Sequence, residues 1–495
     1  MLRRLSLIFT ALVLTAAMPI QRDPVPESVD GAHWLQFDSG HRPLSVITTQ
    51  NVGLLTTVWR TALPEPADGS PVYVSGVLPR LPERDFLIVS TIAGRLFAVD
   101  ASTGIRMWQT TPPVGPRWTT SSPAVDPTHS YVYAYTLDGY VHRYNIRNGG
   151  EVTGPGWPAL ITLKGEVEKG SSNISIATAA NGHTYLYMTT AGYPDPGDEG
   201  DYQGHLVTID LDSGEQHVFN ALCSDRDTHF TDRGDRSDCS SVQAGVWARA
   251  GAVYDRQTNR VFITTGNGGY NAHLGGFNWG TSVVALRPDG TTDGGTPIDS
   301  YTPEDFQKLT DEDLDLSSTT IEALPSTHKG WPRLGVQSGK DGKLRLLNLE
   351  NLSGQGGPRH IGGEIQILDL PQRNTVLTQP TAWIDSARRI WLFVSNNHGI
   401  TAYQLVADAD DNPQLVQEWA SADIHGTTPV IVNGIIYLAS PHQLTALRAS
   451  TGAVLWRDKS IGDIHWQSPI IVNDRVYIAD NPGYITAYSL PSTLR

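Results

Sequence analysis

The chain has 495 residues, including 48 Gly, 32 Pro, 13 Trp and 18 Tyr, and only 18% of its residues are charged. This composition is unlike that of a helical or disordered chain and favours a large β-rich fold with many turns. The net charge of −15 repels phosphate backbones and anionic lipid surfaces, which argues against nucleic acid as the main partner. The acidity serves solubility or, in the alternative, a cation site or a basic partner.

The first 17 residues have the order of a secretory signal peptide. Arg3 and Arg4 precede the apolar run 5–14, and small residues follow at 15–17. We expect residues 18–33 to form a linker. No lipobox cysteine follows the leader, and no second stretch of about 18 apolar residues is present. We therefore expect a secreted or periplasmic chain without a membrane span after signal removal.

The chain contains two cysteines, Cys223 and Cys239, which lie in one polar, Asp-rich stretch. Because export places the chain in an oxidising compartment, we expect these cysteines to form a disulfide. The alternative, a metal site built from two cysteines, has little chemical support.

One sequence motif recurs along the chain, and the prediction of the fold rests on it. Residues 98–104 read Ala-Val-Asp-Ala-Ser-Thr-Gly, with Trp108 four positions on, and residues 446–452 read Ala-Leu-Arg-Ala-Ser-Thr-Gly, with Trp456 four positions on. Each copy predicts a strand, a tight turn at Thr-Gly and a second strand, whose Trp can pack back over the repeat. Weaker copies end at 149, 214, 290 and 354, and two more without the Gly turn begin at Ala402 and Ala487.

These eight units predict a closed ring of sheets. Each full copy is followed by the next, weaker copy after about 41–45 residues, which is typical of four-stranded propeller blades, and insertions lengthen the middle units. The last unit has no room for a fourth strand, but residues 55–63, which contain Trp59, have the missing pattern. We therefore predict an all-β, eight-bladed β-propeller of four-stranded antiparallel blades over residues 34–495, whose last blade is closed by an N-terminal strand.

The phrase Ala-x-Asp-x-x-Thr-Gly-x-x-x-Trp at 98–108 resembles the tryptophan-docking motif of the pyrroloquinoline quinone (PQQ) type propellers, the quinoprotein alcohol dehydrogenase-like family. The resemblance covers nearly the whole mature chain. It implies the fold but not the cofactor, because noncatalytic relatives, including an outer-membrane assembly lipoprotein, carry the same motif.

Comparison with the PQQ-dependent alcohol dehydrogenases implies two calcium ligands. Glu199 stands five positions before Gly204, as does the family's Glu ligand, and Asn267 ends a Thr-Gly-Asn phrase like that of the next ligand. Carboxylate and amide oxygens suit a hard cation such as Ca²⁺. The alternatives are a solvated residue of an acidic loop for Glu199 and a turn residue for Asn267.

The same resemblance implies a binding place for the quinone. Trp247 precedes the Thr-Gly-Asn phrase and corresponds to the Trp on which the quinone ring lies, although the interval from Trp247 to Asn267 is two residues longer than in the family. Lys340 matches a basic residue that touches the quinone oxygens. The alternatives are a core Trp and a turn Lys.

Asp315 falls nearest the position of the family's catalytic Asp, after a Thr-Pro phrase at 302–303. An Asp beside a metal-bound quinone could accept the hydroxyl proton of an alcohol while hydride passes to the quinone. The alternative is an exposed acidic loop, since Asp311, Glu312 and Asp313 precede it.

The sequence departs from the family in one clear respect. The family's vicinal Cys-Cys pair, which covers the other face of the quinone, is missing, because the two cysteines here are sixteen positions apart. There is also no Cys-x-x-Cys-His haem motif, so electrons would pass to a separate acceptor. Two hypotheses therefore remain: a PQQ- and calcium-dependent dehydrogenase of an alcohol or sugar, and a cofactor-free propeller that binds a protein partner as an envelope scaffold.

Overall fold

The computed structural model describes residues 33–37, 45–78, 84–115, 117–193, 201–231, 238–372 and 375–492. The chain divides into two units, residues 1–31 and 32–495, and every described residue belongs to the second. The proposed signal peptide, residues 1–17, lies outside the described residues. No helix among the described residues is both long and apolar enough to cross a membrane.

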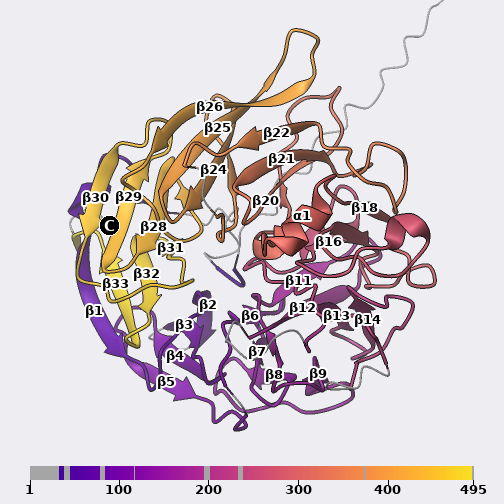
Figure 1. Ribbon diagram of the computed structural model, residues 1–495. Coiled ribbons are helices and arrows are strands. Elements are labelled where there is room, and N and C mark those ends of the chain that lie inside the picture. Colours follow the sequence, from indigo (N-terminus) through magenta and orange to yellow (C-terminus); the bar gives the residue numbers. More distant parts are fainter. Residues whose placement is uncertain are drawn as a thin grey trace, which may run out of the picture. The chain divides into compact units, whose positions relative to one another are not determined.

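The described residues form eight antiparallel sheets arranged as the blades of a ring (Figure 1). Blade 1 consists of β2 (Val72–Leu78), β3 (Arg84–Ser90), β4 (Leu96–Asp100) and β5 (Arg106–Gln109), and blade 2 of β6 (Ala124–Val125), β7 (Tyr131–Tyr135), β8 (Tyr140–Asn145) and β9 (Ala159–Leu160). Blade 3 consists of β10 (Glu168–Gly170), β11 (Ser175–Thr178), β12 (Thr184–Gly192), β13 (His205–Asp210) and β14 (Gln216–Asn220). Blade 4 consists of β15 (Val253–Asp255), β16 (Arg260–Thr264), β17 (Val283–Leu286) and β18 (Asp299–Tyr301).

Blade 5 consists of β19 (Glu322–Ala323), β20 (Leu334–Ser338), β21 (Lys343–Asn348) and β22 (Gln366–Asp369), and blade 6 of β23 (Thr381–Ile384), β24 (Ile390–Asn396), β25 (Gly399–Ala407) and β26 (Pro413–Ser421). Blade 7 consists of β27 (Val430–Val432), β28 (Ile435–Ser440), β29 (Gln443–Arg448) and β30 (Val454–Asp458). Blade 8 consists of β31 (Ile470–Val472), β32 (Arg475–Asp480), β33 (Tyr484–Ser489) and the N-terminal strand β1 (Thr56–Ala62). The helical segments in this part of the chain are short: α1 (Phe306–Asp311), η1 (Val52–Leu54), η2 (Ala272–Leu274) and η3 (Leu316–Ser318). The prediction of an all-β, eight-bladed propeller is confirmed.

The recurring turn has a local chemical cause. In the full copy, the Asp100 side chain accepts hydrogen bonds from the backbone N–H groups of Ser102 and Thr103, each at 3.0 Å. Gly104 then adopts a φ of +71°, which an L side chain rarely tolerates, and its N–H donates to the Asp100 carbonyl at 2.8 Å. The turn thus joins the third and fourth strands of blade 1.

The ring closes as the sequence predicts. Strand β1 pairs antiparallel with β33, with Thr57 opposite Tyr488 and Trp59 opposite Ala487. In Figure 1 the indigo β1 lies beside the yellow strands of the last blade. Because the N-terminal strand completes blade 8, the two ends of the described chain hold one sheet together, and an open edge between the first and last blades is avoided.

Repeated tryptophans join four pairs of neighbouring blades. Four of them lie on the fourth strands of their blades, and we call them the rim tryptophans: Trp59, Trp108, Trp419 and Trp456. The Trp108 Nε1–H of blade 1 donates to the Ile146 carbonyl of blade 2 at 3.0 Å. A Cβ on Gly149 would lie 2.5 Å from the Trp108 ring, so only Gly leaves room for it. The expectation that this Trp packs back over its own repeat was wrong, because it docks onto the turn of the following blade.

Apolar clusters fill the spaces between neighbouring blades. One cluster joins blades 1 and 2, another blades 2 and 3, and others continue in the same way to blades 6 and 7. The largest cluster spans blades 7, 8 and 1 across the closure. Since each sheet is covered on both faces by its neighbours, the strands read as nearly continuous apolar runs, as in β4 and β24. Loops that end near the axis are thereby held in fixed positions.

Candidate functional site

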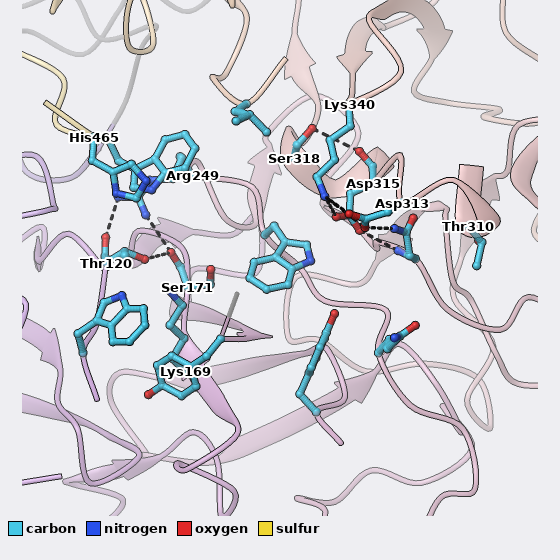
Figure 2. Close-up of a pocket in the computed structure, with 18 of the residues that line it drawn as sticks. Thr120, Lys169, Ser171, Arg249, Thr310, Asp313, Asp315, Ser318, Lys340 and His465 are labelled. Atoms are coloured by element: carbon cyan, nitrogen blue, oxygen red, sulfur yellow. Dashed lines mark hydrogen bonds and ion pairs between the residues drawn. The ribbon is translucent and has the colours of Figure 1, made fainter. Parts of the chain in front are cut away.

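A cavity of about 680 Å³ opens among loops from several blades, and all four described candidate site residues line it: Trp247, Asn267, Asp315 and Lys340. Figure 2 shows its labelled residues in two groups, with Thr310, Asp313, Asp315, Ser318 and Lys340 on one side and Thr120, Lys169, Ser171, Arg249 and His465 on the other. We call these groups the acidic side and the basic side. Glu199, the remaining predicted metal ligand, lies outside the described residues.

On the acidic side, Asp315 lies between two donors. Lys340 Nζ is 2.6 Å from Asp315 Oδ2, and the backbone N–H of Asn267 donates to Asp315 Oδ1 at 2.9 Å. The Asn267 side chain turns the other way and donates from Nδ2 to Asp313 Oδ1 at 2.7 Å. A Cβ on Gly266 would lie 2.4 Å from Asp315 Oδ1. The Gly of the Thr-Gly-Asn phrase is therefore what allows Asp315 to approach the Asn267 backbone.

The neighbouring acidic residues differ sharply in burial. The side chain of Asp313 is 81% exposed, whereas that of Asp315 is 8% exposed. The alternative of an exposed loop thus describes Asp313 but does not describe Asp315. Lys340 lies in the turn between β20 and β21, and it contacts both carboxylates.

Burial sets the electrostatics of this side. It raises the pKa of the Asp315 carboxyl above its ordinary value, and the Lys340 ammonium and the Asn267 N–H offset only part of this rise. Burial also acts to lower the pKa of Lys340, but the carboxylates of Asp315 and Asp313 outweigh it, and the pKa of Lys340 is raised. Lys340 is therefore a firmly charged partner, while Asp315 is a carboxyl that holds a proton more tightly than a solvated Asp.

The segment 239–247 carries Trp247 to the cavity through a series of backbone and side-chain bonds. Gln203 Nε2 donates to the Ser241 carbonyl at 2.8 Å, and the N–H of Gln243 donates to the Tyr202 carbonyl at 2.7 Å. The rings of Tyr202 and Trp247 meet edge to face, with centroids 5.8 Å apart. The blade 3 residues just after the Glu199 stretch thus fix the position of this segment.

The same segment braces the Thr-Gly-Asn phrase and is anchored by a disulfide. The N–H of Ala244 donates to the Asn267 carbonyl at 2.6 Å. A disulfide joins Cys223 to Cys239, as expected from the sequence, at the start of the segment. Trp247, Asn267 and the disulfide therefore belong to one connected piece of structure.

On the basic side, Arg249 is buried at the junction of three blades. Its Nη1 donates to the Ser171 carbonyl at 3.0 Å, and its Nη2 donates to the carbonyls of Thr120 at 2.7 Å and Asp68 at 3.2 Å. Its guanidinium carbon lies 5.5 Å from the centroid of the Trp466 ring. Burial lowers the pKa of Arg249 to about 10, so Arg249 stays charged near neutral pH and fastens the inner loops around the cavity.

Aromatic rings complete the basic side. Lys169 Nζ lies 5.4 Å from the Trp118 ring centroid and 5.6 Å from that of Tyr193. His465 Nδ1 is 2.9 Å from Asp68 Oδ2. Trp118, Tyr193 and His465 all line the cavity with Lys169. Together with Trp247, they make a cavity with several aromatic surfaces and charges of both signs.

Sequence reasoning did not single out these basic-side residues. Trp118 and Trp466 each stand shortly before a Ser-Pro phrase, at 122–123 and 468–469, and both phrases precede the first strand of a blade. Those phrases predicted only where strands begin. Since the first strands of the blades lie nearest the axis in Figure 1, large aromatic or basic residues just before them are the signal that would have identified this side of the cavity.

The oxygen atoms present suit a hard cation but do not complete a site. Asn267 Oδ1 is buried and has no hydrogen-bond partner among the described residues, which leaves it available as a ligand. Within those residues, no group of three His, Cys, Asp or Glu side chains could hold a metal ion. Asn267 therefore fits a calcium site, and a complete set of ligands would also need Glu199.

Comparison with protein families identifies the class. The PQQ family model, described as the β-propeller domain of glucose/ethanol/alcohol dehydrogenase, matches residues 36–292, more than half of the chain. The chain belongs to this family. A second model, described as outer membrane protein assembly factor BamB, matches residues 388–492. No curated protein sequence matches the chain significantly.

Solved structures agree on the fold. A quinohemoprotein alcohol dehydrogenase from Comamonas testosteroni superimposes with a TM-score of 0.61 at 16% identity, covering 93% of this chain and 80% of that one. A europium-containing methanol dehydrogenase gives 0.59 at 15% identity, covering 93% and 98%. BamB from Moraxella catarrhalis gives 0.52 at 14% identity, covering 89% and 99%. At these identities the likeness concerns the propeller and not the activity.

Proposed function

We propose that this chain is an exported PQQ- and calcium-dependent dehydrogenase that oxidises an alcohol or a sugar in the cavity described above. The observation that carries the proposal is the meeting of Trp247, Asn267, Asp315 and Lys340, residues from three separate stretches of the sequence, around one cavity. A buried carboxyl with a raised pKa beside a charged Lys is costly to maintain, and such groups concentrate at functional sites. The leader at 1–17 supports a secreted or periplasmic location.

Asn267 Oδ1 would bind the calcium ion, with Glu199 as a second ligand. Trp247 would support one face of the quinone, and Lys340 would donate hydrogen bonds to its oxygens. When bound, PQQ supplies a carbonyl that accepts hydride, and a hard cation polarises that carbonyl. In the absence of a vicinal cysteine pair, the aromatic rings of the basic side are the groups available to shield the other face of the quinone.

Asp315 would accept the hydroxyl proton of the substrate. Each of its oxygens receives one donor, from Lys340 at 2.6 Å and from the Asn267 N–H at 2.9 Å. A carboxylate oxygen has further acceptor capacity, so a substrate hydroxyl can still donate to it. The two donors fix the direction of the carboxylate, and the raised pKa brings its basicity closer to that needed near neutral pH. Electrons would then leave to a separate acceptor.

The scaffold alternative has its own support in the match of residues 388–492 to the BamB model. A protein-binding scaffold needs exposed edges and loops and does not need a buried Asp315–Lys340 pair inside the ring. For this reason the dehydrogenase is the function that the cavity favours.

Reconstitution tests the proposal. Purified mature chain is titrated with PQQ and Ca²⁺, with tryptophan fluorescence reporting binding and an artificial electron acceptor reporting oxidation of an alcohol and sugar panel. The variant Asp315→Asn should bind PQQ as the parent does and lose oxidation by roughly 10²- to 10⁴-fold, because it removes the base alone. If the parent chain binds no PQQ at micromolar concentration with Ca²⁺ present, the dehydrogenase proposal is wrong.

A further inference from the structure

A second cavity adjoins the first. Its volume is about 430 Å³, and it shares the side chains of Leu377, His465 and Trp466 with the cavity that contains Asp315. Its remaining lining comes from blades 6 to 8, on the end of β28, on the loops that follow β24 and β28, and on the loops that precede β23, β27 and β31. We call this second cavity the annex. Its volume lies within the range of about 300–1,000 Å³ that is usual for ligand pockets.

Polar side chains line the annex. Asn397, His425 and Ser440 line it, and their side chains form no hydrogen bond with any residue that the structure describes. Ser440 is 8% exposed as a whole residue, whereas Asn397 and His425 are exposed. No Asp, Glu, Lys or Arg among the described residues lines the annex. A ligand that hydrogen-bonds without carrying charge is therefore the one that suits it.

An aromatic ring stands where the two cavities meet. The Trp466 ring has the Arg249 guanidinium 5.5 Å from its centroid and the His465 ring 4.5 Å away. These contacts hold the indole in place. An indole face covers apolar C–H surface, while nearby amide, imidazole and hydroxyl groups exchange hydrogen bonds with hydroxyls. This combination matches a ring or chain of carbons in which each carbon carries a hydroxyl.

We propose that the annex binds the unreacting part of an uncharged, polyhydroxylated substrate, a sugar or sugar alcohol, while the hydroxyl to be oxidised lies at Asp315. The placement of the reacting hydroxyl rests on the proposed dehydrogenase function, whereas binding in the annex does not. Binding energy from a remote part of a substrate can orient the reacting group. A two-carbon alcohol such as ethanol cannot reach both cavities and so gains nothing from the annex.

Binding is tested on the full mature chain without PQQ. Saturation-transfer NMR with D-sorbitol, D-glucose and ethanol as probes should detect the two polyhydroxylated probes. His425→Phe and Asn397→Leu should each weaken sorbitol binding by about three- to tenfold, the usual worth of one neutral hydrogen bond. The matched control is His442→Phe, because His442 is an exposed histidine of the same blade that pairs with Asp463 and does not line the annex. It should bind sorbitol as the parent does.

Kinetics separate the two proposals. If the chain binds PQQ and oxidises alcohols, His425→Phe and Asn397→Leu should raise the ratio of KM for sorbitol to KM for ethanol, and His442→Phe should not. Ethanol oxidation without sorbitol binding, or equal sorbitol binding in all three variants, would overturn the annex and leave the dehydrogenase in place. Sorbitol binding that the two annex variants weaken, in a chain that binds no PQQ, would uphold the annex and overturn the dehydrogenase.

Discussion

The rim tryptophans and Trp247, one of the tryptophans that line the axial cavity, differ in how their indole N–H groups are satisfied. Every rim tryptophan donates its indole N–H to a backbone carbonyl of the next blade or of the closing segment, at 3.0–3.2 Å; the acceptors for Trp59, Trp108, Trp419 and Trp456 are Ala101, Ile146, Ala449 and Leu55. At the axis, the buried Nε1 of Trp247 has no hydrogen-bond partner among the described residues.

This difference distinguishes tryptophans that stabilise the fold from a tryptophan that the fold places at the cavity. A buried N–H without a partner costs free energy, and folded proteins retain few of them. The fold satisfies the rim indoles completely, so their chemistry is explained without any ligand. Trp247 lines the cavity beside Asn267, whose Oδ1 is also buried without a partner. Unlike the rim indoles, Trp247 Nε1 and Asn267 Oδ1 therefore have no hydrogen-bond partner supplied by the described residues.

The largest expected effect is on the rim. Replacing Trp108 with Ala removes an 8% exposed indole, its bond to Ile146 and its contact with Gly149. The free energy of unfolding should fall by about 3–5 kcal/mol, which urea denaturation followed by circular dichroism measures. PQQ affinity of the molecules that remain folded should be unchanged. If Trp108→Ala lost as much PQQ affinity as Trp247→Ala, the rim and axial tryptophans would not have separate roles.

Much of the rim was predictable because its chemistry is local and repeated. The strand, Thr-Gly turn and Trp recur with a fixed spacing, and the lone Trp59 at 55–63 supplied the missing strand of blade 8. The direction in which the Trp docks was missed. Nothing in a single repeat says whether Trp108 contacts its own turn or that of the following blade, because this depends on how two blades stack.

Near the axis, only the residues that lie in a motif resembling the family pattern could be predicted from the sequence. Asn267, Asp315 and Lys340 were selected by their likeness to a family pattern, and they share the acidic side. Arg249 and Trp466 belong to blades 4 and 8 and meet only after the ring closes. Their contact is set by the angle between blades, and no pattern within either stretch records it.

We expect the disulfide between Cys223 and Cys239 to affect both the stability of the fold and ligand binding at the cavity. Replacing Cys223 and Cys239 together with Ser opens a loop of about 15 residues, so the free energy of unfolding should fall by about 3 kcal/mol in the chain-entropy model. PQQ affinity should fall as well, because the segment 239–247 carries Trp247. Calorimetry and PQQ titration of the same sample measure both. Lost stability with unchanged PQQ affinity would mean that the disulfide braces only its own loop.

A smaller effect is expected from Trp247→Ala. The half-buried indole gives up no hydrogen bond, so the free energy of unfolding should fall by no more than about 2 kcal/mol. Loss of ring stacking should weaken PQQ binding by about tenfold, or about 1.4 kcal/mol, which is near the upper range for an aromatic pair. Fluorescence titration against Trp108→Ala gives the comparison. Unchanged PQQ binding in Trp247→Ala would place Trp247 with the structural tryptophans.

The smallest effect concerns the pH dependence of oxidation. Burial raises the pKa of Asp315, and Lys340 opposes that rise. Since the proposed base acts only when deprotonated, activity should fall as the pH drops through this raised pKa. Lys340→Met removes the opposing charge, so the acidic limb of kcat/KM should move to higher pH by about one unit. The matched control is Lys343→Met, since Lys343 pairs with Asp305 at 3.0 Å and leaves Asp315 untouched. A limb that stays in place in Lys340→Met, or that moves equally in Lys343→Met, would mean that the titrating base is not Asp315.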